Sequence, residues 1–282
     1  MRIPSIAYND LANGCPKASS KLVSALTHPG VLTIGLQLEM VSFKELFRWT
    51  KWFFELPEDE IARICATPYR GYFAAVPGKV SFKNYFEIGG FNSAVEIDQH
   101  TSRVPVNIQR IVTDVNKWPL PNTAEGCQFR QFMTNYYKIM TSICENILKT
   151  LTDATGEDYD EWLELFGPKA LSTLRLTQYP LRSSPPPEDA FVNDKLLSTG
   201  PHTDTPFMTL LATFGQPGLQ IQTQDLNWHD VELDENQNSL VMNIGDQMVK
   251  QLSSSFGKSG VPAVRATNHR VLDIGRVRYR SL

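Results

Sequence analysis

The sequence has little cysteine, and the cysteines it has are scattered. Its 282 residues include four, Cys15, Cys65, Cys127 and Cys144, and no two of them form a C-x-x-C pair. A structural zinc site and a thioredoxin-type dithiol are therefore not expected. We predict free thiols in a reducing compartment.

The sequence also lacks long apolar runs and an excess of one charge. No stretch reaches the roughly 18 consecutive apolar residues of a transmembrane helix, and the N-terminus does not resemble a signal peptide. Lys and Arg number 27 against 30 Asp and Glu, for a net charge of -3, without the basic excess that nucleic acids and anionic membranes favour. We expect a cytoplasmic monomer with neither of these partners.

Apolar residues recur at helical spacing in the first half of the chain. Ser42 and Glu45 have capping-box spacing before an aromatic-rich segment. Apolar side chains then repeat every three or four positions from Phe129 to Leu151. We predict helices in both places and a short helix over 158–166, whereas the glycines between 71 and 90 predict a loop.

Short extended segments, separated by Gly, Pro and Asn or Asp clusters, fill the second half. The predicted strands cover 171–179, 208–213, 219–222, 239–244 and 270–274. Regularly spaced short strands are typical of a barrel or sandwich, a set that includes the jelly roll. We therefore divide the chain into a helix-rich N-terminal region, residues 1–165, and a mainly β core, residues 166–282.

The sequence contains only five histidines, and two of them suggest a metal site. His202 and Asp204 form an H-x-D pair, and in an extended chain residues i and i+2 face the same side. With His269 they would make the facial triad of non-haem Fe(II) oxygenases, which leaves three coordination positions open. The H-x-D pair alone is weak evidence, and catalytic zinc uses the same types of ligand.

Further motifs surround these histidines and extend over nearly the whole chain. They are Gly30–Leu32, Arg70–Tyr72, Tyr85–Gly89, Gly200–Thr205, Gly218–Gln220, Asn243–Asp246 and Ala266–Val271. In this order they resemble the isopenicillin N synthase-like 2-oxoglutarate/Fe(II)-dependent dioxygenases. The resemblance implies a double-stranded β-helix, or jelly roll, with a helix-rich N-terminal region. It also implies that His202, Asp204 and His269 bind Fe(II) between the sheets.

The resemblance also implies a site for the co-substrate 2-oxoglutarate. Arg278 matches the arginine of the family's Arg-x-Ser motif, which binds the far carboxylate of 2-oxoglutarate. A buried carboxylate needs a fixed cationic partner, and the arginine fork provides two parallel hydrogen bonds. Tyr179 matches the tyrosine of the family's N-x-Y-P segment, which reaches the same co-substrate.

The implied activity is the oxidation of a small molecule of secondary metabolism by hydroxylation, desaturation or ring closure. Fe(II), O₂ and 2-oxoglutarate would take part, and succinate and CO₂ would be released. An oxidase of the isopenicillin N synthase type would use the same triad and O₂ without 2-oxoglutarate. A catalytically inactive, truncated paralogue is a third alternative. Substrate-binding residues are not predicted.

Three departures from the family pattern bear on these alternatives. Arg280 stands where the motif has serine, and it is expected to share a face with Arg278, where it would crowd the co-substrate or bind a substrate carboxylate. Ser281 comes one residue late and is expected on the opposite face. Family members usually continue beyond Leu282, which suggests a truncated or alternatively terminated product, or an incomplete gene model. The segment 246–266 departs from the family's short strand and turn, which suggests an insertion.

Overall fold

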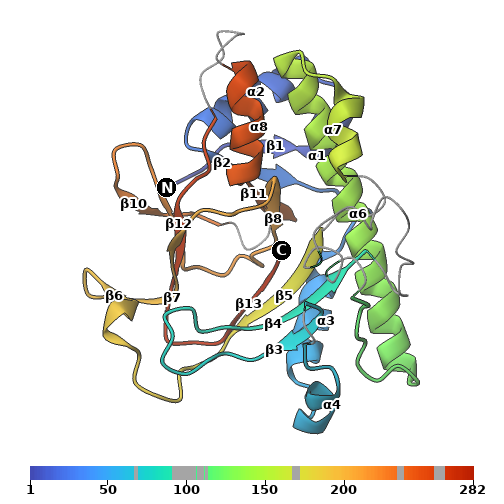
Figure 1. Cartoon of the computed structure of the whole chain (residues 1–282), viewed down its shortest axis with the longest axis vertical. Helices are drawn as coiled ribbons and strands as arrows, with labels where there is room; N and C mark the ends of the chain where they lie inside the picture. Colours follow the sequence, from blue (N-terminus) through green and yellow to red (C-terminus); the bar gives the residue numbers. More distant parts are fainter. Residues whose placement is uncertain are drawn as a thin grey trace.

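The computed structural model describes residues 1–66, 69–90, 106, 111, 114–166, 172–233, 238–256 and 264–282. Its strands form three sheets (Figure 1). The first contains, in spatial order, β1 (Ser5–Ala7), β2 (Val31–Gly35), β11 (Ser239–Ile244) and β8 (Met208–Leu211). The second contains β10 (Trp228–Asp230), β9 (Leu219–Gln222), β12 (His269–Leu272), β7 (Lys195–His202) and β6 (Phe191–Val192). The third contains β13 (Arg278–Ser281), β5 (Thr173–Tyr179), β4 (Asn84–Gly89) and β3 (Gly71–Phe73).

The helices occupy most of the N-terminal half. They are α1 (Tyr8–Ala12), α2 (Pro16–Thr27), α3 (Phe43–Phe54), α4 (Glu58–Arg63), α6 (Ala124–Thr155), α7 (Tyr159–Phe166) and α8 (Asp246–Phe256), with a 3₁₀ turn, η2, at Glu188–Ala190. Within the described ranges, no helix is both long and apolar enough to span a bilayer.

The sheets join segments that lie far apart in the sequence. β2 pairs antiparallel with β11, and β4 pairs antiparallel with β5. Strands from before residue 165 therefore complete two of the three sheets. The glycine-containing segment 71–90, predicted to be a loop, contains β3 and β4 instead, so that prediction was wrong. Its glycines do not break the strands: Gly71 and Gly89 stand at the ends of β3 and β4.

The predicted helices are present, and their caps agree with their sequences. The Ser42 side chain accepts a hydrogen bond from the Glu45 backbone N–H at 3.3 Å and caps α3. The long helix α6 contains the predicted apolar stripe and ends at Gly156, which adopts a left-handed conformation. Asp246–Phe256, within the segment that suggested an insertion, forms α8.

An aromatic cluster fastens α3 and α6 to the third sheet. The Phe53 ring on α3 lies 4.3 Å from the Phe86 ring on β4 and 5.7 Å from the Phe129 ring on α6, measured between ring centroids. All three side chains are buried in the main core, and Figure 1 shows α6 running along this side of the molecule. Aromatic contacts of this kind add to the gain from apolar burial.

Strand alternation gives the third sheet two different faces. On β5, Leu174 and Leu176 belong to the core beneath the helices, so Arg175, Thr177 and Tyr179 face the opposite side. β4 and β13 follow the same pattern: Phe86, Ile88 and Tyr279 pack on the helix side. The other face of this sheet is therefore polar.

Replacing Phe53 by Ala is expected to lower the free energy of unfolding by roughly 3–5 kcal/mol, because the cavity would lie inside the aromatic cluster. Urea denaturation monitored by circular dichroism measures the change. Leu38→Ala is the control, since that side chain is 69% exposed and its loss should cost well under 1 kcal/mol. Equal effects of the two substitutions would contradict the assignment of Phe53 to the core.

Candidate metal centre and co-substrate pocket

Three side chains that could bind a metal converge where β7 meets β12. His202, the last residue of β7, pairs directly with His269, the first residue of β12. Asp204 follows two residues later, with its Oδ1 3.9 Å from His202 Nε2 and 3.7 Å from His269 Nε2. One ligand atom from each of the three lies within 4.8 Å of the others. The structure thus brings together the three residues that the sequence proposed as metal ligands.

Backbone carbonyl groups orient both imidazole rings. His202 Nδ1 lies 2.9 Å from the Gly200 carbonyl oxygen, and His269 Nδ1 lies 3.0 Å from the Thr267 carbonyl oxygen. A carbonyl oxygen only accepts hydrogen bonds, so Nδ1 carries the proton in each ring. The Nε2 lone pairs are then free to bind a metal ion, as in metal sites where a second hydrogen bond fixes the tautomer.

Hydrogen bonds from two side chains orient the Asp204 carboxylate. Its Oδ2 accepts hydrogen bonds from the Thr209 hydroxyl at 2.7 Å and from the Asn243 side-chain amide at 2.9 Å. These bonds leave Oδ1 directed toward the two imidazoles. Two oriented imidazoles and one oriented carboxylate match the ligand set that non-haem Fe(II) sites use.

The electrostatics of the centre favour a bound cation. Burial by itself would raise the pKa of Asp204, but His269 and the hydrogen bonds from Asn243 and Thr209 outweigh it and lower that pKa below its usual range. Burial, together with neighbouring His269, lowers the pKa of His202. At neutral pH the centre therefore holds an ionised carboxylate and a neutral His202.

The motif around Gly245 positions the turn that bears Asp204. A Cβ atom on Gly245 would lie 1.9 Å from the Pro206 carbonyl oxygen, so only glycine fits there. Next to it, the Asp246 backbone N–H donates to the Asp204 carbonyl oxygen at 2.8 Å. The Thr203 hydroxyl donates to the Asp246 carboxylate at 3.0 Å. The N-x-G-D segment thus contributes structurally to the metal centre.

Arg278 lies inside the molecule, on the polar face of the third sheet. It is only 1% exposed, and it donates to the Pro217 carbonyl oxygen and to the Ser198 hydroxyl, each at 3.1 Å. Its guanidinium lies 4.9 Å from the centroid of the Tyr179 ring, and the two residues are direct partners across β13 and β5. A Cβ on Gly218 would come within 2.3 Å of Arg278 Nη1, so glycine is required beside it.

Arg278 forms no salt bridge with any acidic side chain of the described residues, and burial lowers its pKa. A buried cation without a carboxylate partner is unfavourable. Ser198, which it contacts, is on β7 four residues before His202. Ser198 was not among the predicted site residues, because its contact with Arg278 forms only when β7 and β13 come together in the fold.

Arg280 is also buried, but its guanidinium binds the protein backbone. Nη1 donates to the carbonyl oxygens of Thr213 at 2.6 Å and Tyr279 at 3.0 Å. Nη2 donates to those of Gln216 at 2.6 Å and Pro217 at 3.0 Å. Burial lowers its pKa to about 10. Arg280 therefore acts as a clamp on the turn 213–217 rather than as a second ligand-binding arginine.

Ser281, the residue after Arg280, lies on the other face of β13, close to Tyr136 of α6. The one-residue shift therefore removes its hydroxyl from the pocket, as alternation along a strand predicts.

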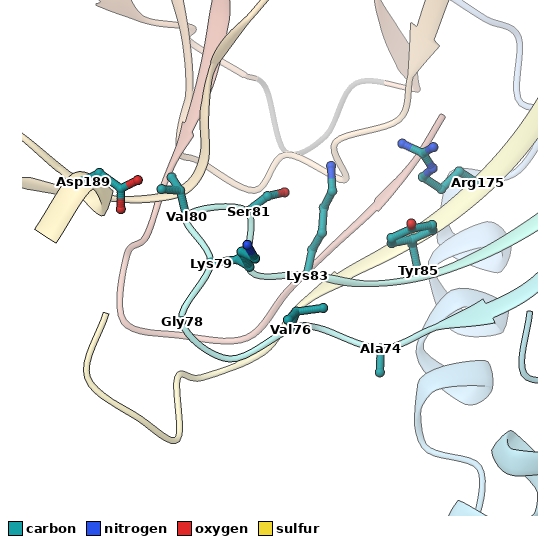
Figure 2. Close-up of a pocket in the computed structure, with 10 residues that line it drawn as sticks. All are labelled: Ala74, Val76, Gly78, Lys79, Val80, Ser81, Lys83, Tyr85, Arg175 and Asp189. Carbon is teal, nitrogen blue, oxygen red and sulfur yellow. The ribbon is translucent and has the colours of Figure 1, made fainter. Parts of the chain in front are cut away.

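A cavity of about 560 Å³ opens beside the metal-bearing strand (Figure 2). Its walls are formed by Ala74, Val76, Gly78, Lys79, Val80, Ser81, Lys83, Tyr85, Arg175 and Asp189. The three candidate metal ligands are not among its lining residues. Most of the lining comes from the segment between β3 and β4, which the sequence assigned to a loop without any binding role.

Comparisons with known proteins agree with this geometry. Residues 172–280 match the family described as the 2OG-Fe(II) oxygenase superfamily. The chain is 32% identical over 163 residues to Jasmonate-induced oxygenase 3 of Arabidopsis thaliana, covering 56% of this chain and 39% of that protein. It is 28% identical over 212 residues to the 2-oxoglutarate-dependent dioxygenase ecdK of Aspergillus rugulosus, covering 72% and 61% of the two chains. The chain thus spans less than two thirds of these relatives.

A solved structure has the same fold. The full-length Neurospora crassa protein crystallised with alpha-KG and 5-formyluracil superposes with a TM-score of 0.74 at 21% identity, over 99% of this chain and 82% of that one. The predicted jelly roll with a helix-rich N-terminal region is therefore confirmed. The matched residues, 172–280, contain all three candidate metal ligands and Arg278.

Asp204→Ala is expected to reduce Fe(II) affinity by more than tenfold, because it removes the only anionic ligand of the triad. Anaerobic Fe(II) titration followed by calorimetry measures this affinity. Asp153→Ala is the control, since Asp153 is an exposed carboxylate paired with Lys149 on α6. Unchanged affinity in the Asp204 variant would refute the metal assignment.

Arg280→Ser, which would restore the family's motif serine, is expected to destabilise the protein by at least roughly 2 kcal/mol, because buried carbonyl groups lose charged donors. Chemical denaturation measures this loss, and Arg276→Ser serves as the control because Arg276 is exposed. If the Arg280 variant is as stable as the parent protein, Arg280 does not clamp the turn.

Proposed function

We propose that this chain is a non-haem Fe(II)- and 2-oxoglutarate-dependent oxygenase that oxidises a small molecule and releases succinate and CO₂. One observation carries the proposal. Two oriented imidazoles and a carboxylate converge at the β7–β12 junction. On β7, four residues before His202, Ser198 accepts a hydrogen bond from Arg278, a buried arginine without a carboxylate partner. The cluster of imidazoles and carboxylate suits a divalent metal ion, and the Arg278 guanidinium suits an anionic ligand.

Each part of the site has a distinct task in this proposal. His202, His269 and Asp204 would hold Fe(II), with the remaining coordination positions open for ligands. Arg278 would bind the far carboxylate of 2-oxoglutarate through its guanidinium, beside the Ser198 hydroxyl and against the Tyr179 ring. When bound together, Fe(II), 2-oxoglutarate and O₂ supply an oxidant able to attack a C–H bond.

The protein's own contribution is positioning and the exclusion of water. The carbonyl groups of Gly200 and Thr267 fix the two imidazole planes, and Thr209 and Asn243 fix the carboxylate. Because these hydrogen bonds direct the three ligand atoms toward one point, a metal ion can bind with little rearrangement of the side chains. Burial of Arg278 strengthens its attraction for a carboxylate, since the local dielectric constant is low.

The buried arginine also distinguishes the proposal from its alternatives. An oxidase that does not use 2-oxoglutarate would need another anion, such as a substrate carboxylate, to pair with this guanidinium. For an inactive paralogue, the same buried charge would lower stability without any compensating function. The 2-oxoglutarate-dependent reaction gives Arg278 a partner, and for this reason we prefer it.

Arg278→Lys is expected to weaken 2-oxoglutarate binding by roughly tenfold or more and to leave Fe(II) affinity unchanged, because lysine keeps the charge but loses the fork. Anaerobic titration of the Fe(II) protein with 2-oxoglutarate, followed by the weak visible charge-transfer band, measures the co-substrate affinity, and anaerobic Fe(II) titration followed by calorimetry measures the Fe(II) affinity. Arg48→Lys on the exposed surface of α3 is the control.

The result for the unmodified protein separates the three alternatives. A charge-transfer band that weakens in the Arg278 variant supports the proposal. Oxidation of a substrate that consumes O₂ but forms no succinate would instead establish an oxidase. If Fe(II) does not bind the unmodified protein, the proposed function is wrong and the chain is an inactive paralogue.

A further inference from the structure

The segment between β3 and β4, residues 74–83, is fixed against the strand that bears the candidate metal ligand His202. The Phe82 backbone N–H donates to the Ser198 carbonyl oxygen at 3.0 Å, and Val80 packs over Gly200, since a Cβ there would lie 3.5 Å from Val80 Cγ1. This segment therefore holds the cavity in a defined position beside β7.

Arg182 reinforces this arrangement. Its guanidinium donates to the carbonyl oxygens of Lys79 at 3.2 Å and Val80 at 2.9 Å on the segment, and to that of Leu197 on β7 at 2.9 Å. One side chain thus joins the cavity wall to the metal-bearing strand. It is itself held by Asp273, at 3.5 Å. The cavity does not depend on a freely moving loop.

The cavity is lined by three cationic side chains and one acidic side chain. The cations are Lys79, Lys83 and Arg175, and the acid is Asp189. Arg175 is already paired with Glu87. Lys83 is half-buried and has no acidic partner among the described residues. Lys83 is therefore the cation that most needs an anion.

The rest of the lining defines the shape of a ligand. The Tyr85 ring stacks beneath the Arg175 guanidinium, with 4.8 Å between the ring centroid and Cζ, and Val76 and Val80 add apolar surface. Figure 2 shows the Lys83 and Arg175 side chains extending to the same side of β4, with the Tyr85 ring beneath the Arg175 guanidinium. A volume of about 560 Å³ suits a molecule of metabolite size.

We propose that this cavity binds the substrate through an anionic group, and that the substrate is a small carboxylic acid with a flat or apolar body. The Lys83 ammonium binds the carboxylate, and the Tyr85 ring and the valines contact the body. The cavity wall contacts β7 at Ser198 and Gly200, and β7 ends at His202, so the cavity lies along the strand that carries this candidate metal ligand. This inference rests on the proposed function for the reaction, whereas its binding step is tested separately.

The test compares carboxylic acids with their own neutral amides. Cinnamate with cinnamamide, and 2-naphthoate with 2-naphthamide, are titrated into the anaerobic protein loaded with Fe(II) and 2-oxoglutarate, and binding is measured by calorimetry. At least one acid is expected to bind tenfold or more tightly than its amide. Lys83→Gln should abolish this preference, and Lys83→Arg should retain most of it.

Lys138→Gln is the matched control, since Lys138 is exposed on α6, and it should leave the preference unchanged. The charge-transfer band of the Lys83→Gln protein should equal that of the parent, which shows that the variant folds and forms the metal and co-substrate sites. Equal binding of acid and amide in every pair, or a preference that survives in Lys83→Gln, overturns the inference.

The two proposals can fail independently. If the parent protein develops no charge-transfer band but still prefers the acids through Lys83, the proposed function fails and the anion site stands. If the band develops and weakens in Arg278→Lys but no acid preference is found, the proposed function stands and the substrate class is wrong. Repeating the acid and amide titrations without iron separates these two results.

Discussion

The antiparallel pairing of β7 with β12 is the constraint on which the rest of the site depends. It sets His202 directly opposite His269, although 67 positions separate them in the sequence. Backbone hydrogen bonds, rather than side-chain contacts, therefore fix the separation of the two imidazoles. A slip of one residue in this register would turn one imidazole to the opposite face of the sheet.

Residues around the two strands fix what the strand pairing leaves open, namely the orientation of the imidazole rings and the position of Asp204. Strand pairing places the two Cα atoms, but the ring planes depend on the carbonyl groups that accept from Nδ1. The third ligand lies beyond the end of β7, in a turn that needs Gly245 and the Asp246 backbone N–H to bring it back. The metal centre is thus a rigid pair of strands combined with one turn that adjacent residues hold in place.

Several residues of the candidate site could be identified from the sequence by their chemistry and spacing. The H-x-D pair, the distal His269, Arg278 and Tyr179 all lie where the motifs put them, and the α6 stripe and the Ser42 cap were found from periodicity and spacing. β3 and β4 were missed because glycine suggested a loop. Gly89 is there for a different reason: a Cβ on it would collide with the buried Arg70 guanidinium.

Residues whose roles depend on tertiary contacts could not be predicted. Nothing local in the sequence says that Ser198 meets Arg278, or that Lys83 lies beside the metal-bearing strand without an acidic partner. Arg280 is the clearest case. Its position in the motif suggested a ligand-binding role, but the structure directs its donors to the carbonyl groups of a turn that comes close only after folding.

The Pro217 carbonyl oxygen accepts hydrogen bonds from both Arg278 and Arg280. The two arginines therefore share one acceptor and cannot vary independently. Loss of Arg280 would let Pro217 move, and the position of the Arg278 guanidinium would change with it. Loss of Arg278 would leave Arg280 bound to the turn, but the turn would no longer position a second guanidinium. The energetic effects of changing both should differ from the sum of the separate effects. Between related chains, an arginine at position 280 should be exchanged for serine only together with changes in the turn at 213–217.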